Sequence, residues 1–136
     1  MEFAFHLEGG DFTSVGLASS QIKKVLKQIN VDLATIKRVA VALYEAEVNI
    51  VAHARRGDIT VNINPKQVNI HLVDEGPGIS DIEQAMQRGF STASQKVHEM
   101  GFGAGMGLPN IKDNADNFTI HSEIDKGTEL EIIINT

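Results

Sequence analysis

The segment from Leu33 to Ala54 constrains the fold most, because it is long enough for a helix and almost continuously apolar. Asp32 stands directly before it, as a helix N-cap would. Its few polar residues are Lys37, Arg38, Glu45, Glu47, Asn49 and His53. A helix that is apolar around most of its circumference is buried. The sequence therefore predicts a central helix around which the other elements pack, with Glu47 in a structural role.

The other segments of the chain predict strands and shorter helices. Strands are expected over residues 1–8, 59–64, 68–73, 117–123 and 129–134. Helices are expected over about 11–30, capped by Asp11 or Thr13, over about 80–87, and from about 107 onward. Adjacent strands joined by tight turns form antiparallel hairpins. We therefore expect an α+β two-layer sandwich, with a mixed, mostly antiparallel sheet and helices on one face, in a single domain over residues 1–136.

The charge and composition exclude several classes of protein. The formal net charge of -6 argues against a protein whose main ligand is the phosphate backbone of DNA or RNA. The chain has no cysteine, so it has no disulfide framework, and its N-terminus resembles neither a signal peptide nor a membrane span. A cytoplasmic location is therefore expected. The histidines lack metal-ligand spacing, so no zinc site is expected; they are His6, His53, His71, His98 and His121.

The segment from Gly101 to Leu108 has glycine at every second position, up to Gly107. Glycines allow successive backbone N–H groups to point at one ligand, and the helix that follows adds partial positive charge. The pattern favours a phosphate site, although a flexible surface loop has the same composition. It matches neither the dinucleotide fingerprint nor a Walker loop. Residues of about 88–106 are expected to form a lid.

Two polar side chains interrupt the apolar central helix four residues apart. Glu45 and Asn49 therefore share a face of that helix. An amide oxygen suits a Mg²⁺ ion already held by phosphate oxygens, and a carboxylate can accept a proton from an attacking hydroxyl. A partly exposed helix edge explains both residues equally well.

Asp74 ends an apolar strand and begins Asp74-Glu75-Gly76-Pro77-Gly78. A carboxylate at a strand end can accept a hydrogen bond from an exocyclic amine such as that of adenine. The glycines would let the backbone pass close to a flat base. Taken alone, the same pattern is typical of a simple turn.

Four motifs together resemble the nucleotide boxes of the gyrase, heat-shock chaperone, histidine kinase and mismatch-repair ATPase superfamily. They are Glu45-x-x-x-Asn49, Asp74-x-Gly76-x-Gly78, Gly103-x-Gly105-x-Gly107-Leu108 and Lys126-Gly127-Thr128. The resemblance covers nearly the whole chain. It implies the Bergerat fold, with ATP and Mg²⁺ as ligands.

The resemblance also implies roles for individual residues. Asn49 would contact Mg²⁺, Asp74 would recognise the adenine, and Thr128 would support the base pocket. The implied nucleotide contacts also include Gly76, Gly78, Ile79, Gly101, Gly103, Ala104, Gly105, Met106, Gly107 and Leu108.

Within that superfamily the chain is most similar to bacterial partner-switching serine kinases, which include anti-sigma factors. Arg88-Gly89-Phe90-Ser91-Thr92 strengthens this comparison. The resemblance implies that Glu45 activates a serine hydroxyl on a STAS-domain partner. A histidine kinase domain often has Lys three residues after the Asn, where this chain has Ala52. A sigma factor or a phosphatase would be a further partner.

Several alternatives stay open. The chain could instead be a switch module that binds ATP without turnover and holds a regulator, or an ATPase without a protein substrate. Arg88 and Lys112 could neutralise phosphate charge or be solvated surface residues. Val15, Leu17 and Ile22 in the first predicted helix fit a homodimer face as well as a core-facing stripe.

Overall fold

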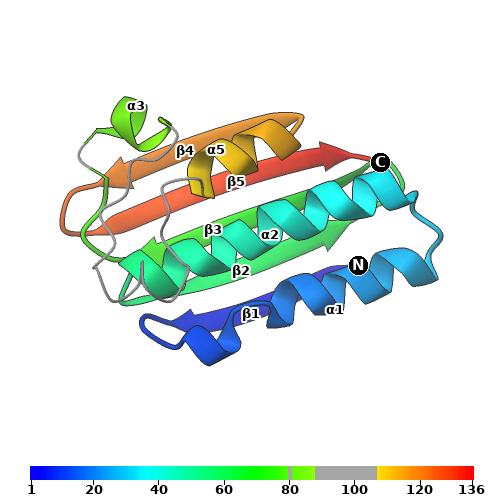
Figure 1. The fold of residues 1–136 in the computed structure, drawn as a ribbon, viewed down its shortest axis with the longest axis horizontal. Coiled ribbons are helices and arrows are strands. Elements are labelled where there is room, and N and C mark those ends of the chain that lie inside the picture. Colours follow the sequence, from blue (N-terminus) through cyan, green and yellow to red (C-terminus); the bar gives the residue numbers. More distant parts are fainter. Residues whose placement is uncertain (80, 88–106) are drawn as a thin grey trace.

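The computed structural model describes residues 1–79, 81–87 and 107–136. Five strands form one sheet in the order β1-β2-β3-β5-β4. They are β1 (Glu2–Glu8), β2 (Arg56–Ile63), β3 (Gln67–Glu75), β4 (Asn117–Glu123) and β5 (Gly127–Asn135). Within the described residues the helices are a 3-10 turn at Phe12–Ser14, α1 (Leu17–Gln28), α2 (Leu33–His53), α3 (Ile82–Ala85) and α5 (Gly107–Asn114). Figure 1 shows α1, α2 and α5 side by side over one face of the sheet.

The predicted two-layer α+β architecture is confirmed, and the four strand pairings are antiparallel. Alternate residues of each strand face the helices, as the period of two requires. In β2, for example, Ile59 and Val61 are buried, while Asp58 before them and Asn62 after them are exposed. The helix-covered face of the sheet therefore supplies one half of the core, and the other face meets solvent.

Helix α2 lies at the centre of the helical layer and supplies the other half of the core. Its N-terminus is capped as predicted, because the Asp32 side chain accepts a hydrogen bond from the Thr35 N–H at 2.8 Å. Near its other end the helix approaches β2 so closely that a methyl group on Gly57 would lie 2.7 Å from Ile50 Cδ1. Glycine at this position allows the helix to pack directly on the strand.

The predicted helix over residues 11–30 is wrong at its start. The chain forms a short 3-10 turn at Phe12–Ser14, and α1 begins only at Leu17, after Gly16 adopts a φ of 98°. Asp11 accepts hydrogen bonds from the hydroxyls of Thr13 and Ser14 and does not cap the helix. The left-handed backbone at Gly16 interrupts the helix, because helical residues need negative φ.

The cap of α1 comes from another helix. Glu47 of α2 is 1% exposed, and its Oε1 accepts a hydrogen bond from the Ala18 N–H at 2.8 Å. No hydrogen bond from the described residues reaches its Oε2. Burial raises the pKa of the Glu47 carboxyl, and the Ala18 N–H opposes that rise. Glu47 thus joins α1 to α2, which agrees with the structural role expected from the sequence.

We predict that Glu47→Ala destabilises the protein by about 1–3 kcal/mol, because a buried N–H at the start of α1 loses its acceptor. Glu47→Gln keeps an acceptor at this position and should lose much less. Urea unfolding of both variants beside the wild type measures the difference. Equal losses in the two variants would contradict the capping role.

Candidate functional site

The first cluster of polar residues lies where α2 meets the start of α5. Glu45 and Asn49 are both half-buried on α2. A methyl group on Gly107, the first residue of α5, would lie 3.1 Å from Asn49 Oδ1 and 3.5 Å from Glu45 Oε2. The two side chains therefore converge on the backbone at the N-terminal end of α5.

Glu45 has a further neighbour that the sequence analysis missed. Asn110, one turn into α5, donates a hydrogen bond from Nδ2 to Glu45 Oε1 at 3.3 Å. Burial raises the pKa of the Glu45 carboxyl, and the Asn110 hydrogen bond opposes that rise. The signal for Asn110 was its spacing of three from Gly107, which places both residues on one side of the helix. The result is a half-buried carboxylate held by one weak donor.

The second cluster forms where β3 ends beside the start of β5. Asp74 is half-buried, and its Oδ1 accepts a hydrogen bond from the Thr128 N–H at 3.0 Å. Its Oδ2 accepts none from the described part of the chain. A methyl group on Gly127, whose φ is +151°, would lie 1.9 Å from the Asp74 carbonyl oxygen. Burial raises the pKa of the Asp74 carboxyl, against the lowering effect of the Thr128 N–H.

Ser122, near the end of β4, links three of the predicted site segments and was also missed. Its Oγ accepts a hydrogen bond from the Ile79 N–H at 2.7 Å and lies 2.9 Å from Thr128 Oγ1. This network brings Asp74, Ile79 and Thr128 together. Nothing in the sequence pattern singled out Ser122, because one serine in an alternating strand has no distinctive spacing.

The two glycines of the Asp74-x-Gly76-x-Gly78 motif make close contacts with the chain itself. The Gly76 N–H donates to the Lys126 carbonyl at 3.1 Å. Gly78 has a φ of +77°, and a methyl group on it would lie 2.4 Å from the Glu123 carbonyl oxygen. These glycines therefore allow the turn after β3 to pack against the β4–β5 hairpin.

The structure does not place the other expected contact residues in these two clusters. Gly101, Gly103, Ala104, Gly105 and Met106 lie outside the described residues, as do Arg88 and the whole expected lid of about 88–106. Leu108 is 8% exposed and belongs to the hydrophobic core, so its side chain faces the protein interior. Lys112 is exposed on α5 and has no ion pair with the described residues.

The model of one protein family, the histidine kinase-like ATPase domain, matches residues 10–134. The chain belongs to this family. The superfamily resemblance inferred from the four motifs is therefore confirmed, and membership of the histidine kinase-like ATPase family implies the use of ATP. Among the described residues, no helix is both long and apolar enough to span a membrane.

Relatives within this family carry informative names. The chain is 32% identical over 115 residues to the serine/threonine-protein kinase RsbT of Bacillus subtilis (strain 168), across 82% of this chain and 80% of that protein. It is 32% identical over 106 residues to the anti-sigma F factor of Thermoanaerobacter sp. (strain X514), across 74% and 71%. Both names agree with the partner-switching type inferred from the sequence.

A solved structure agrees in fold. The mycobacterial sensor histidine kinase MprB superposes with a TM-score of 0.53 at 16% identity, over 99% of this chain and 97% of that one. At this identity the likeness concerns the fold of the histidine kinase-like ATPase domain alone.

We predict that Asp74→Asn removes the rise in melting temperature that Mg-ATP gives the wild type. A ligand that binds only the native state raises its stability. The asparagine can still accept the Thr128 N–H, but it replaces the second carboxylate oxygen by a donor. Asp116→Asn is the matched control, because Asp116 also accepts a backbone N–H, from Asn135, at 2.7 Å and lies outside both clusters. A full Mg-ATP shift in Asp74→Asn would refute the role of Asp74.

Proposed function

We propose that this chain is a protein serine/threonine kinase that transfers the γ-phosphoryl group of ATP to a serine of a STAS-domain partner. The observation that carries the proposal is the convergence of Glu45 and Asn49 on Gly107. Gly107 is the first residue of α5, and the glycine-rich segment directly precedes this helix in sequence. Membership of the histidine kinase-like ATPase family implies the use of ATP, and the name of the relative RsbT supports transfer to a serine or threonine of a protein. The kinase domain is proposed to comprise residues 1–136.

The described residues fit a nucleotide. Asp74 Oδ2 accepts no hydrogen bond from them, so it can receive one from the adenine amine. Ile79 and Thr128, held beside Asp74 through Ser122, would border the base together with Gly76 and Gly78. The phosphates would lie toward Gly107 and the glycines that precede it in sequence. In this assignment the base lies beside the end of β3 and the start of β5, and the phosphates lie between α2 and the start of α5.

Asn49 is proposed to ligate Mg²⁺. A methyl group on Gly107 would lie 3.1 Å from Asn49 Oδ1 and 3.5 Å from Glu45 Oε2, so both oxygens face the same part of the backbone. Among the described residues no group of three or more His, Cys, Asp or Glu could hold a metal ion. An Asn oxygen with phosphate oxygens and waters is the usual way in which Mg²⁺ is held beside a nucleotide. The ion would neutralise phosphate charge during transfer.

Glu45 is proposed to be the general base. The serine Oγ of the partner forms a bond to the γ-phosphorus, the bond from that phosphorus to the β–γ bridging oxygen breaks, and ADP leaves. The hydroxyl proton passes to the Glu45 carboxylate. Burial raises the pKa of this carboxyl, which makes it a stronger base than an exposed glutamate. A phosphorylated partner then carries extra negative charge and is repelled by a chain of net charge -6.

We predict that Glu45→Gln lowers phosphoryl transfer to a cognate STAS-domain protein by about 100-fold or more, because the amide cannot accept the proton. Its thermal shift with Mg-ATP should stay close to that of the wild type. Phosphoserine on the partner, measured by mass spectrometry over time, reports the rate, and Glu129→Gln on the solvent face of the sheet is the control. Nucleotide-dependent partner binding without phosphoserine in the wild type would favour the switch-module alternative.

We also predict a pH effect through Asn110. Transfer should fall as the pH is lowered through the pKa of Glu45, since the protonated carboxyl is not a base. Asn110→Ala removes the hydrogen bond that lowers this pKa. The acid limb of the pH–rate profile should therefore move to higher pH in Asn110→Ala. An unmoved acid limb would show that Glu45 is not the titrating group.

A further inference from the structure

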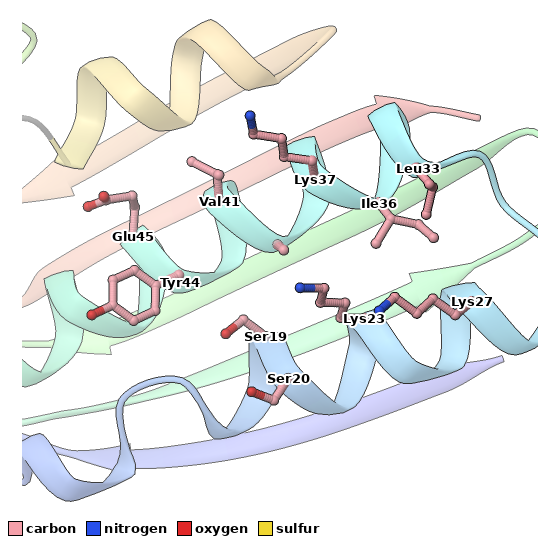
Figure 2. A pocket seen from close by; sticks show the side chains of 11 residues that line it. Ser19, Ser20, Lys23, Lys27, Leu33, Ile36, Lys37, Val41, Tyr44 and Glu45 are labelled. Atoms are coloured by element: carbon pink, nitrogen blue, oxygen red, sulfur yellow. The ribbon is translucent and has the colours of Figure 1, made fainter.

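An open groove runs between α1 and α2 and ends at Glu45. The α1 side includes Lys23 and Lys27, and the α2 side includes Lys37 and Tyr44. Figure 2 shows Lys23 and Lys27 extending from α1 into the space beside α2, with Ile36 and Tyr44 facing the same space. Of the residues in the two clusters described above, Glu45 is the one that also lines this groove.

The groove combines an apolar floor with basic rims. Ile36 is 2% exposed, whereas Leu33 is 75% exposed and Tyr44 38% exposed, so apolar surface continues from the core out to solvent. Lys23, Lys27 and Lys37 are exposed and have no ion pair with the described residues. Lysines four residues apart on a helix lie on one side of it. The groove therefore offers an apolar strip flanked by unpaired positive charge.

This positive charge is local. Residues 12–44 contain five Lys and Arg and one acidic residue, although the whole chain has a net charge of -6. The other basic residue on α2, Arg38, is already paired with Asp116 at 3.0 Å. A basic surface on an acidic protein attracts an acidic partner to one place and repels it from the rest.

We propose that this groove docks an acidic amphipathic helix of the phosphoacceptor protein, with apolar residues on the groove floor and carboxylates against the three lysines. Helix-in-groove recognition uses this combination of an apolar strip and flanking charges. Because the groove ends at Glu45, a segment docked there brings its protein to the proposed base. The inference rests on the proposed kinase function and names the recognition element of its substrate.

A second copy of this chain is a poorer occupant. A two-fold interface through the groove would place the lysines of one copy against those of the other, which is unfavourable. An acidic segment of another protein meets no such repulsion, and its contribution to binding should weaken with salt.

The test measures binding of the full chain to a fluorescein-labelled peptide in which Glu and Leu recur at helical spacing. A matched peptide has Gln in place of Glu. The wild type should bind the acidic peptide more tightly than the Gln peptide, and binding should weaken as salt is added. Lys23→Glu/Lys37→Glu, with one change on each rim, should weaken binding by about tenfold or more. Lys24→Glu/Lys66→Glu makes the same change of net charge outside the groove and should bind as the wild type does.

Three results would overturn the proposal: no binding of the acidic peptide to the wild type, equal binding of the two peptides, or equal effects of the two double variants. Self-association of the wild type that Lys23→Glu/Lys37→Glu abolishes would also overturn it, in favour of a second copy. The thermal shift with Mg-ATP is measured on every variant. If Mg-ATP does not raise the melting temperature of the wild type, the proposed kinase function is refuted. If it does, but the groove variants bind the peptide as the wild type does, this inference alone is refuted.

Discussion

The structure depends on the burial of α2 between the sheet and the two helices beside it. Ten of its 21 residues are buried, and its close approach to β2 at Gly57 leaves no space for a side chain there. Each large apolar side chain removed from water contributes about 1.5–3 kcal/mol, so this helix accounts for much of the driving force for folding.

One edge of α2 stays only partly covered, and that edge holds the residues proposed to take part in phosphoryl transfer. Glu45 and Asn49 lie half-buried on this edge, where the start of α5 approaches them at Gly107. The carboxylate is thereby kept half-buried and its pKa is raised, without being sealed from a substrate. The same helix forms one wall of the α1–α2 groove, so the proposed partner recognition and the proposed proton transfer would share one helix.

The parts that the sequence predicted are those encoded by local rules. Helical spacing predicted that Glu45 and Asn49 share a face, and Asp32 signalled the start of α2. The start of α1 was mispredicted because its cap, Glu47, comes from a residue 29 positions away from Ala18. Ser122 was missed for the same reason, since its importance arises from a contact across the fold with Ile79. Long-range hydrogen bonds leave no periodic trace in a single sequence.

The strand order leaves β1 and β4 at the edges of the described sheet, each with one row of backbone groups unpaired by another strand. Such edges can recruit further strands and seed aggregates. Here the solvent-facing positions of β1 include Glu2, His6 and Glu8, and β4 ends at the exposed Glu123. Charge along these edges disfavours sheet extension between molecules, so the edge strands carry their own protection against aggregation.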